Sequence, residues 1–297
     1  MRHLLNITDL SAEEFVHVLD LAERADLRPV LAGLGVALIF EKPSNRTRQS
    51  MEMAVAQLGG HPVYTRGEEV GFDVRETVED ITRVMGGYHA MLGARVLDHA
   101  VVERMAAVNT VPIVNMLSDH SHPLQGLADA LTMQQVHGSL AGRTVAYIGD
   151  YNNVARSLAE ACMLLDANVT LGCPVGYNAT DTELERLNLL GDGRVRQVHR
   201  ADDAVAGAIA VHTDTWTSMG QEAEKEDRKQ AFEGYTVTDR MMARAAPNAG
   251  FYHCLPAYRG YEVAADVIDG PHSHVFRQAH NRMHAARGAL AFLMGVR

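Results

Sequence analysis

The sequence has little lysine, little cysteine and no long apolar run. Lysine occurs three times against 24 arginines, and no Gly-Lys-Ser/Thr phosphate-binding loop is present. The three cysteines form no CxxC pair, which argues against a disulfide framework or a zinc site and fits a reducing cytoplasm. The longest apolar run, residues 31–40, is too short to span a bilayer, and early acidic residues argue against a signal peptide. We therefore expect a cytoplasmic protein with no membrane partner.

Positive charge is also in deficit, with 27 basic against 37 acidic residues and a net charge of −10. Nucleic-acid binders usually have a basic balance or a basic stripe, so no nucleic acid is expected as a partner. Hydrophobic residues make up 47% and charged residues 22% of the 297, as in globular proteins. A chain of this length favours two domains over one.

A buried strand followed by a helix is predicted in both halves of the chain. The first half has a strand at 36–40, a helix at 50–58 and a strand at 61–64. The second half repeats the alternation with a strand at 144–148 and a helix at 154–165. Further predicted elements are strands at 169–171, 209–212 and 250–255 and a helix at 183–190. This alternation predicts two α/β domains, each a doubly wound parallel sheet.

The predicted boundary between these domains follows a helix that ends at Gly138. We expect a first domain over 1–137 and a second over 138–278, joined by a hinge within 134–142. Apolar residues at three- and four-residue spacing predict an amphipathic C-terminal helix. We expect the segment 279–297 to return to the first domain.

Residues 44–48, Ser-Asn-Arg-Thr-Arg, follow the first predicted strand and open the next helix. Ligands of open α/β sheets bind at the carboxyl ends of the strands, and a helix N-terminus presents free N–H groups to an anion. Two hydroxyls and two guanidinium groups at that place favour a phosphate site. The plainer interpretation is a capped helix with surface arginines.

A second polar segment is His122-Pro-Leu-Gln125, in which proline suits the first position of a helix and His122 its cap. A histidine there can donate a hydrogen bond to a carbonyl oxygen, although a plain helix cap is the better explanation of these four residues taken alone. Nearby Asp119 and His120 lack the second cluster that a metal site needs.

Polar residues also follow strands of the second half. Asp214 and Ser218 come after the strand that ends at His212, and Cys254 follows another strand. Asp214 can pair with an ammonium group, whereas Ser218 and the Met219 backbone can hold a carboxylate. Trp216 is more simply a packing residue and Cys254 a buried apolar one. Asn152 and Asn153, at a predicted helix start, are caps or ligands.

Taken together and in this order, the motifs resemble the aspartate/ornithine carbamoyltransferase family over nearly the whole chain. Residues 44–48 resemble its Ser-Thr-Arg-Thr-Arg motif, Arg95 its mid-domain arginine, and residues 122–125 its His-Pro-x-Gln motif. The ornithine-type features are Asn153, the DxWxSMG segment at 214–220, His-Cys-Leu-Pro at 253–256 and Asn-Arg-x-His at 281–284.

The resemblance implies transfer of the carbamoyl group of carbamoyl phosphate to the δ-amine of L-ornithine. The products are L-citrulline and phosphate, in arginine metabolism and in the biosynthetic direction. It implies no metal or organic cofactor, and self-association as a homotrimer or a multiple of it. Arg95, His122 and Cys254 are implied as catalytic residues, and Asn153, Asp214, Ser218 and Met219 as ornithine-binding residues. The implied carbamoyl phosphate-binding residues are Ser44, Asn45, Arg46, Thr47, Arg95, His122, Pro123, Leu124, Gln125, Cys254, Leu255 and Arg282.

Two departures from the family pattern keep alternatives open. Asn45 replaces the usual first threonine of the phosphate motif, and Gly71 stands about where many ornithine enzymes carry a glutamine. Another acceptor amine, such as putrescine or N-acetylornithine, is the nearest alternative, and a catalytically inactive, ligand-sensing relative is a further one. A nucleotide-dependent oxidoreductase is disfavoured because GxGxxG does not follow the strand at 144–148.

Overall fold

A computed structural model describes residues 1–217 and 222–297. The chain divides into two compact units. Unit 1 comprises Met1–Ala128 and His280–Arg297, and unit 2 comprises Asp129–Ala279. The division falls inside a helix, whereas the sequence placed the boundary at the end of that helix.

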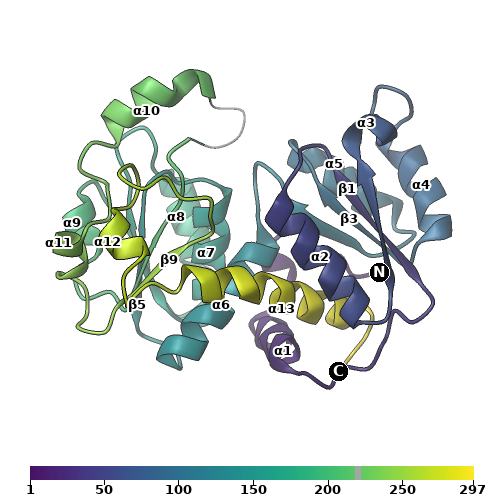
Figure 1. The fold of residues 1–297 in the computed structure, drawn as a ribbon, viewed down its shortest axis with the longest axis horizontal. Helices are drawn as coiled ribbons and strands as arrows, with labels where there is room; N and C mark the ends of the chain where they lie inside the picture. The colour runs from purple at the N-terminus through teal and green to yellow at the C-terminus, as the bar shows by residue number, and fades with distance from the viewer. Residues whose placement is uncertain (218–221) are drawn as a thin grey trace. The chain divides into compact units, whose positions relative to one another are not determined.

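Unit 1 is built on a four-stranded sheet in the order β2-β1-β3-β4, with every neighbouring pair parallel (Figure 1). Its strands are β1 (Gly35–Phe40), β2 (His61–Arg66), β3 (Met91–Arg95) and β4 (Ile113–Leu117). Its helical elements are η1 (Ile7–Asp9), α1 (Ala12–Glu23), α2 (Asn45–Gln57), α3 (Gly67–Val70), α4 (Val78–Tyr88) and α5 (His99–Val108). Helices α6 (Pro123–His137) and α13 (Val275–Leu293) each contribute residues to both units.

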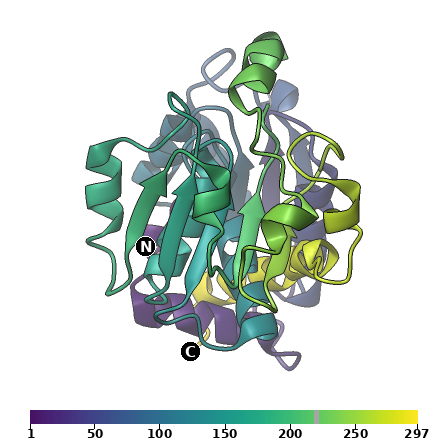
Figure 2. The same ribbon diagram turned by 90° about the vertical axis from the view of Figure 1, so that its left-hand side faces the viewer.

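Unit 2 has a five-stranded sheet in the order β7-β6-β5-β8-β9, again with parallel neighbours (Figure 2). The strands are β5 (Thr144–Ile148), β6 (Asn168–Gly172), β7 (Val195–Val198), β8 (Ala210–Thr213) and β9 (Gly250–His253). The helical elements are α7 (Asn153–Met163), α8 (Asp181–Leu187), α9 (Ala201–Ala204), η2 (Glu222–Glu224), α10 (Lys225–Ala231), α11 (Asp239–Met242) and α12 (Ala265–Ile268).

The burial of alternate side chains explains why residues 144–148 form a central strand, β5. Val145 and Tyr147 pack in one apolar cluster, whereas Ala146 and Ile148 pack in another. Because successive side chains of a strand point to opposite faces, both faces of this sheet are covered. The prediction of two doubly wound parallel α/β units is therefore confirmed.

Helix α2 begins at Asn45, five residues before the predicted start at residue 50. The reason is local, since Ser44 has extended backbone angles and its side chain accepts a hydrogen bond from the Thr47 N–H. The polar segment is therefore the first turn of the helix and not a loop before it. Strands β3 and β4 were not predicted, because Gly93 and buried Asn115 interrupt their apolar runs.

The C-terminal part of α13 packs in unit 1, as expected. Arg287 donates to Gln57 Oε1 at 2.9 Å and to the carbonyl of Ala22 at 2.9 Å. A Cβ atom on Gly288 would lie 2.6 Å from the Val18 carbonyl oxygen and 2.7 Å from the Ala22 nitrogen. Glycine thus permits a backbone approach between α13 and α1 that other residues would obstruct. Among the described residues, no helix combines the length and apolar character needed to cross a membrane.

Candidate active site

The carboxyl end of β1 leads directly into the N-terminus of α2. The Thr47 N–H donates to Ser44 Oγ at 3.4 Å, and Ser44 Oγ donates to Thr47 Oγ1 at 3.1 Å. Asn45 and Arg46 lie exposed in the first turn. A helix N-terminus with hydroxyls and a guanidinium group in its first turn is a suitable environment for an anion.

Arg95, the last residue of β3, belongs to the same region. Because β3 pairs with β1 in a parallel register, its carboxyl end lies at the same sheet edge. Arg95 Nη1 donates to Thr47 Oγ1 at 3.3 Å, and both side chains are buried. Arg48 has other partners: its Nε donates to Glu52 Oε1 at 2.8 Å and its guanidinium lies over the Tyr64 ring. Its positive charge is therefore already balanced.

His122 and Arg282 extend this cationic region in unit 1. Arg282 Nη1 lies 3.3 Å from His122 Nε2 and donates to Gln125 Oε1 at 3.1 Å. All three side chains are buried, and Pro123 is the first residue of α6 as predicted. Burial, together with the charges of Arg282 and Arg95, holds the pKa of His122 well below its ordinary value. His122 is therefore a neutral imidazole at pH 7 and can donate one N–H to a carbonyl oxygen.

Buried polar groups hold the loop before His122 in place. Asn115 Nδ2 donates to the carbonyl of Leu5 at 2.9 Å and to Ser118 Oγ at 3.1 Å. The Ser121 N–H donates back to Ser118 Oγ at 3.2 Å. Leu124, the second residue of α6, is fully buried.

In unit 2, polar residues follow three neighbouring strands, β5, β8 and β9. Asn152 caps α7 by accepting from the backbone N–H groups of Val154 and Ala155, both at 3.0 Å. Its Nδ2 donates to Asp214 Oδ2 at 2.9 Å. Asn153, the predicted ligand, is the first residue of the helix. Asn152 is thus the cap of the pair, a role that the sequence left open between them.

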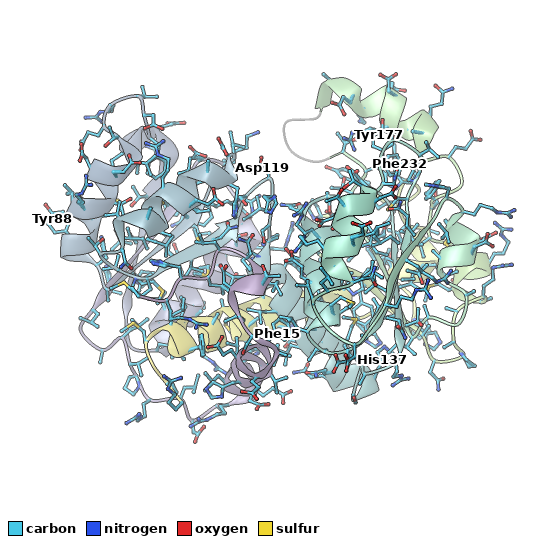
Figure 3. The ribbon with its side chains drawn as sticks, turned by 180° about the vertical axis from the view of Figure 1, so that it is seen from behind. Phe15, Tyr88, Asp119, His137, Tyr177 and Phe232 are labelled. Atoms are coloured by element: carbon cyan, nitrogen blue, oxygen red, sulfur yellow. The ribbon has the colours of Figure 1, made fainter. Side chains whose placement is uncertain are left out.

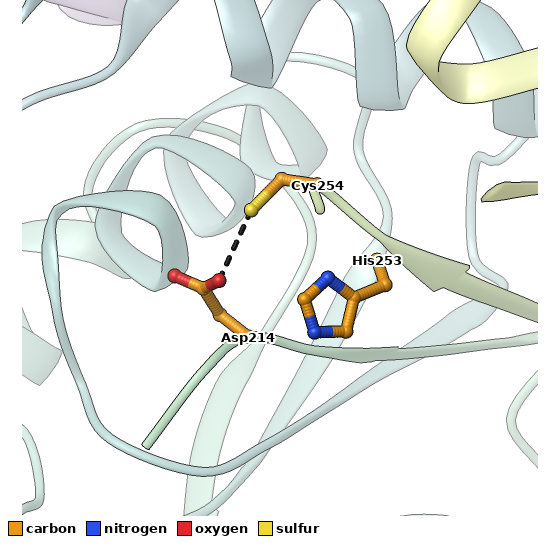
Figure 4. A group of neighbouring side chains, drawn as sticks. All are labelled: Asp214, His253 and Cys254. Atoms are coloured by element: carbon orange, nitrogen blue, oxygen red, sulfur yellow. Dashed lines mark hydrogen bonds between the residues drawn. The ribbon is translucent and has the colours of Figure 1, made fainter. Parts of the chain in front are cut away.

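Asp214 and Cys254 lie against each other. Cys254 Sγ donates to Asp214 Oδ1 at 3.1 Å, and the Thr215 N–H donates to the same oxygen at 2.8 Å (Figure 4). Trp216 is buried in the core and stacks on Phe232, so its interpretation as a packing residue is confirmed. Ser218 and Met219 lie outside the described residues.

The backbone after β9 is shaped by a buried histidine–carboxylate pair. Leu255 has a left-handed φ of 59°, unusual for leucine, and its N–H donates to His253 Nδ1 at 2.8 Å. Since Nδ1 accepts, the proton is on Nε2, which lies 3.3 Å from Glu262 Oε1. Both side chains are buried. Glu262 therefore holds the ring that positions the backbone beside Cys254.

Within residues 1–217 and 222–297, one group of side chains, Asp214, His253 and Cys254, gathers three possible metal ligands with donor atoms within 4.8 Å of one another. Both ring nitrogens of His253 are engaged by Leu255 and Glu262, and Asp214 already accepts three hydrogen bonds. A metal ion would have to displace these partners, so the group is better suited to organising the backbone and the carboxylate.

The predicted residues therefore fall into two connected sets. Unit 1 brings together Ser44, Thr47, Arg95, His122, Gln125 and Arg282, and unit 2 brings Asp214 and Cys254 together beside the start of α7. Sequence reasoning missed Glu262, Asn152 as the Asp214 partner, and Arg228, which donates to Asp150 Oδ2 at 2.7 Å. Arg228 lies in the charged segment 221–230, and nothing in that sequence pattern distinguishes it from its charged neighbours.

The fold and these two sets define a two-domain α/β protein with a buried cationic cluster in one unit and a carboxylate at the sheet edge of the other. The family model for the aspartate/ornithine carbamoyltransferase carbamoyl-P binding domain matches residues 2–135, and that for the Asp/Orn binding domain matches residues 141–293. The chain belongs to the aspartate/ornithine carbamoyltransferase family.

Individual relatives match this chain over nearly their full length. The chain is 43% identical to an ornithine carbamoyltransferase of Parafrankia sp. (strain EAN1pec), covering 99% of this chain and 96% of that one. It is 42% identical to an anabolic ornithine carbamoyltransferase of Pyrococcus furiosus, with the same coverage. A solved structure of ornithine carbamoyltransferase from Pyrococcus furiosus matches with a TM-score of 0.94 and 41% identity, covering 100% of this chain and 98% of that one.

Proposed function

We propose that the protein is an ornithine carbamoyltransferase, which converts carbamoyl phosphate and L-ornithine into L-citrulline and phosphate. The observation that carries the proposal is the buried cluster of Arg95, His122, Gln125 and Arg282 beside the capped N-terminus of α2. Its guanidinium groups balance a phosphate dianion, and its neutral imidazole offers an N–H without adding further charge.

In this proposal unit 1 binds carbamoyl phosphate. The phosphate takes hydrogen bonds from Ser44, Asn45, Arg46 and Thr47 at the start of α2 and further positive charge from Arg282. Arg95, His122 and Thr47 donate to the carbonyl oxygen, where negative charge develops as the amine attacks. Gln125 and the Leu255 carbonyl orient the carbamoyl NH₂, with Pro123 and Leu124 supplying backbone.

Unit 2 binds ornithine in the same proposal. Asp214 pairs with the α-ammonium group, while Asn153, Ser218 and Met219 hold the α-carboxylate. The δ-amine must be neutral to attack, although an alkylamine has a pKa of about 10.4, and desolvation near cationic groups lowers it. Cys254 orients this amine. The nitrogen lone pair forms the new C–N bond, the C–O bond to phosphate breaks, and the amine proton leaves with the phosphate.

The test is citrulline formation from carbamoyl phosphate with a panel of amines: L-ornithine, putrescine, N-acetylornithine and L-aspartate. We expect kcat/KM for ornithine to exceed that of every other acceptor by at least a hundredfold. Preference for putrescine or N-acetylornithine would retain the reaction and replace the acceptor. Absence of carbamoyl transfer to any of the four would contradict the proposal.

The roles of the two domains, the cellular location of the protein and the metabolic direction of the reaction form part of the same proposal. Residues 1–137, with the C-terminal helix of 279–297, form the carbamoyl phosphate domain, and residues 138–278 form the ornithine domain. A cytoplasmic location is supported by three cysteines that form no disulfide with one another. The biosynthetic direction is supported by the word anabolic in the name of the Pyrococcus furiosus relative.

We also propose self-association as a homotrimer or a multiple of it. Helix α4 buries Val78 and Ile81 on one face, yet Val84 and Tyr88, one turn apart, are 50% and 76% exposed. Exposed apolar patches mark interaction surfaces. In analytical ultracentrifugation the wild type should sediment as a trimer or larger, and Val84→Glu with Tyr88→Glu should shift it to smaller species. A monomeric wild type would contradict the proposal.

A further inference from the structure

Two carboxylates lie at the carboxyl ends of the neighbouring strands β5 and β8, and they have very different partners. Asp150 follows β5 and Asp214 follows β8. Asn152 connects the two loops, because its backbone N–H donates to the Asp150 carbonyl at 2.8 Å and its side-chain Nδ2 donates to Asp214 Oδ2 at 2.9 Å. The two acids are therefore part of one polar edge.

Asp150 is paired with a buried cation. Arg228 Nη1 donates to Asp150 Oδ2 at 2.7 Å, and the two side chains are only 6% and 14% exposed. Burial raises the pKa of the Asp150 carboxyl, the hydrogen bond from Arg228 opposes that rise, and the charge of Asp214 adds to it. Asp150 and Asp214 thus influence each other electrostatically.

Arg228 is held in place from several sides. The same Nη1 donates to the Trp216 carbonyl at 3.1 Å, and Nε donates to Glu224 at 2.9 Å. Its guanidinium carbon lies 4.9 Å from the centre of the Tyr177 ring, which itself contacts Phe232 (Figure 3). Glu224 is 56% exposed, so water screens its charge. The main charge partner of Arg228 is therefore Asp150.

The partners of Asp214 among the described residues are of a different kind. Within the part of the chain that the structure describes, its carboxylate accepts from Asn152, Thr215 and Cys254, and all three are neutral donors. The side chain is 6% exposed. The edge as a whole therefore carries one uncompensated negative charge, on Asp214, although it contains two carboxylates.

We propose that Arg228 is a positioning residue that sets acceptor specificity: by neutralising Asp150, it limits the negative charge of this edge to Asp214 and so favours an amino acid over a diamine. The inference rests on the proposed function and concerns the same site. With its attacking amine neutral, ornithine has one ammonium and one carboxylate and no net charge. A diamine such as putrescine has a net charge of +1 in the same state.

An unpaired Asp150 would attract the diamine and repel the ornithine carboxylate. One added charge at a largely buried edge is sufficient for about a tenfold change in relative rate. Neither the attraction of the diamine nor the repulsion of the ornithine carboxylate requires a change in the contacts that Asp214 makes. Charge and geometry can therefore be separated by experiment.

The test compares kcat/KM for putrescine with kcat/KM for ornithine, at alkaline pH where the Asp150 carboxyl stays ionised. We expect Arg228→Met to raise the putrescine-to-ornithine ratio by about tenfold or more. Arg228→Lys, which keeps the charge, should stay within threefold of wild type. The matched control is Asp150→Asn with Arg228→Met, which removes both charges and should return the ratio to within threefold of wild type. Asp150→Asn alone should lower the ratio.

The inference is wrong if Arg228→Met lowers both kcat/KM values equally, or if the double variant fails to restore the ratio. Those results would assign Arg228 a purely structural role. If Arg228→Met does not fold, an unchanged ratio in Asp150→Asn would overturn the inference on its own. Failure of the wild type to form citrulline would instead contradict the proposed function, so the two failures are distinguishable.

Discussion

Units 1 and 2 use the same parallel α/β architecture but carry opposite charge at the ends of their strands. In unit 1 the ends of strands β3 and β4, together with helix α13, bring together Arg95, His122 and Arg282 near a capped helix N-terminus. In unit 2 they bring together Asp150 and Asp214, of which only the first has a cationic partner. The comparison teaches that two units with the same fold can differ in the charge they place at their strand ends, and in the proposed function this difference decides which ligand each unit accepts.

The largest effect is expected from removing a phosphate contact in unit 1. Arg46→Ala should lower kcat/KM for carbamoyl phosphate about a thousandfold, because a charged partner of the dianion is lost. Arg48→Ala is the matched control two residues away, since Arg48 is already paired with Glu52 and lies over Tyr64. Steady-state kinetics should show at most a fewfold loss for that variant. Equal losses in the two variants would contradict the assignment of charge in unit 1.

The corresponding change in unit 2 is Asp214→Asn, which keeps the shape and removes the charge. We expect KM for ornithine to rise about a hundredfold, because the ammonium loses its buried counter-ion. Carbamoyl phosphate affinity should stay within about threefold of wild type, as measured by binding in the absence of ornithine. A change confined to carbamoyl phosphate would reverse the roles assigned to the two units.

The two units also differ in how they are assembled, since unit 1 requires the C-terminal segment and unit 2 is continuous. Gly288→Ala places a methyl group against the backbone of α1 and should lower the free energy of unfolding by about 2 kcal/mol. Gly87→Ala is the control, because a Cβ there meets nothing within 4 Å and alanine favours the helix. Urea unfolding should show no loss of stability for Gly87→Ala.

Both units bury a neutral histidine, His122 in unit 1 and His212 in unit 2, and a buried neutral histidine makes a fold sensitive to acid. Burial lowers the pKa of His212 to about 3, and its ring stacks on Tyr252. Since the unfolded chain binds this proton more readily, the stabilising contribution is complete above about pH 6.5 and declines as the pH falls toward 3. Between pH 6.5 and 5, His212→Leu should lose about 2 kcal/mol less stability than wild type. His61→Leu, at an exposed histidine, should follow the wild type; identical pH slopes in all three proteins would refute this account.

The sequence predicts most of the fold because the signals are local. The apolar run of β1, the cap at Ser44 and the proline that opens α6 each depend on adjacent residues, and the structure confirms each element with shifted ends. Strands β3 and β4 are short and interrupted, so their burial depends on neighbouring strands that no local pattern reveals.

The site residues also divide into those with a local sequence signal and those that depend on tertiary contacts. Ser44, His122 and Asp214 follow predicted strands or open predicted helices, and Arg95 came from the family resemblance alone. Arg228 and Glu262 act on Asp150 and His253 through contacts that only the folded chain creates. Residues that hold a site together are therefore harder to predict than residues that line it, since their partners are fixed by tertiary packing.

The central claim of the proposed function is that unit 1 binds the phosphate group of carbamoyl phosphate and that Asp214 of unit 2 binds the amino acid. The most direct test is calorimetric binding of phosphonoacetamide, a stable analogue of carbamoyl phosphate, to wild type, Arg46→Ala and Asp214→Asn. The account predicts that Arg46→Ala weakens binding by at least a hundredfold and that Asp214→Asn leaves it within threefold of wild type. Comparable weakening in both variants, or unchanged binding in Arg46→Ala, would contradict the claim.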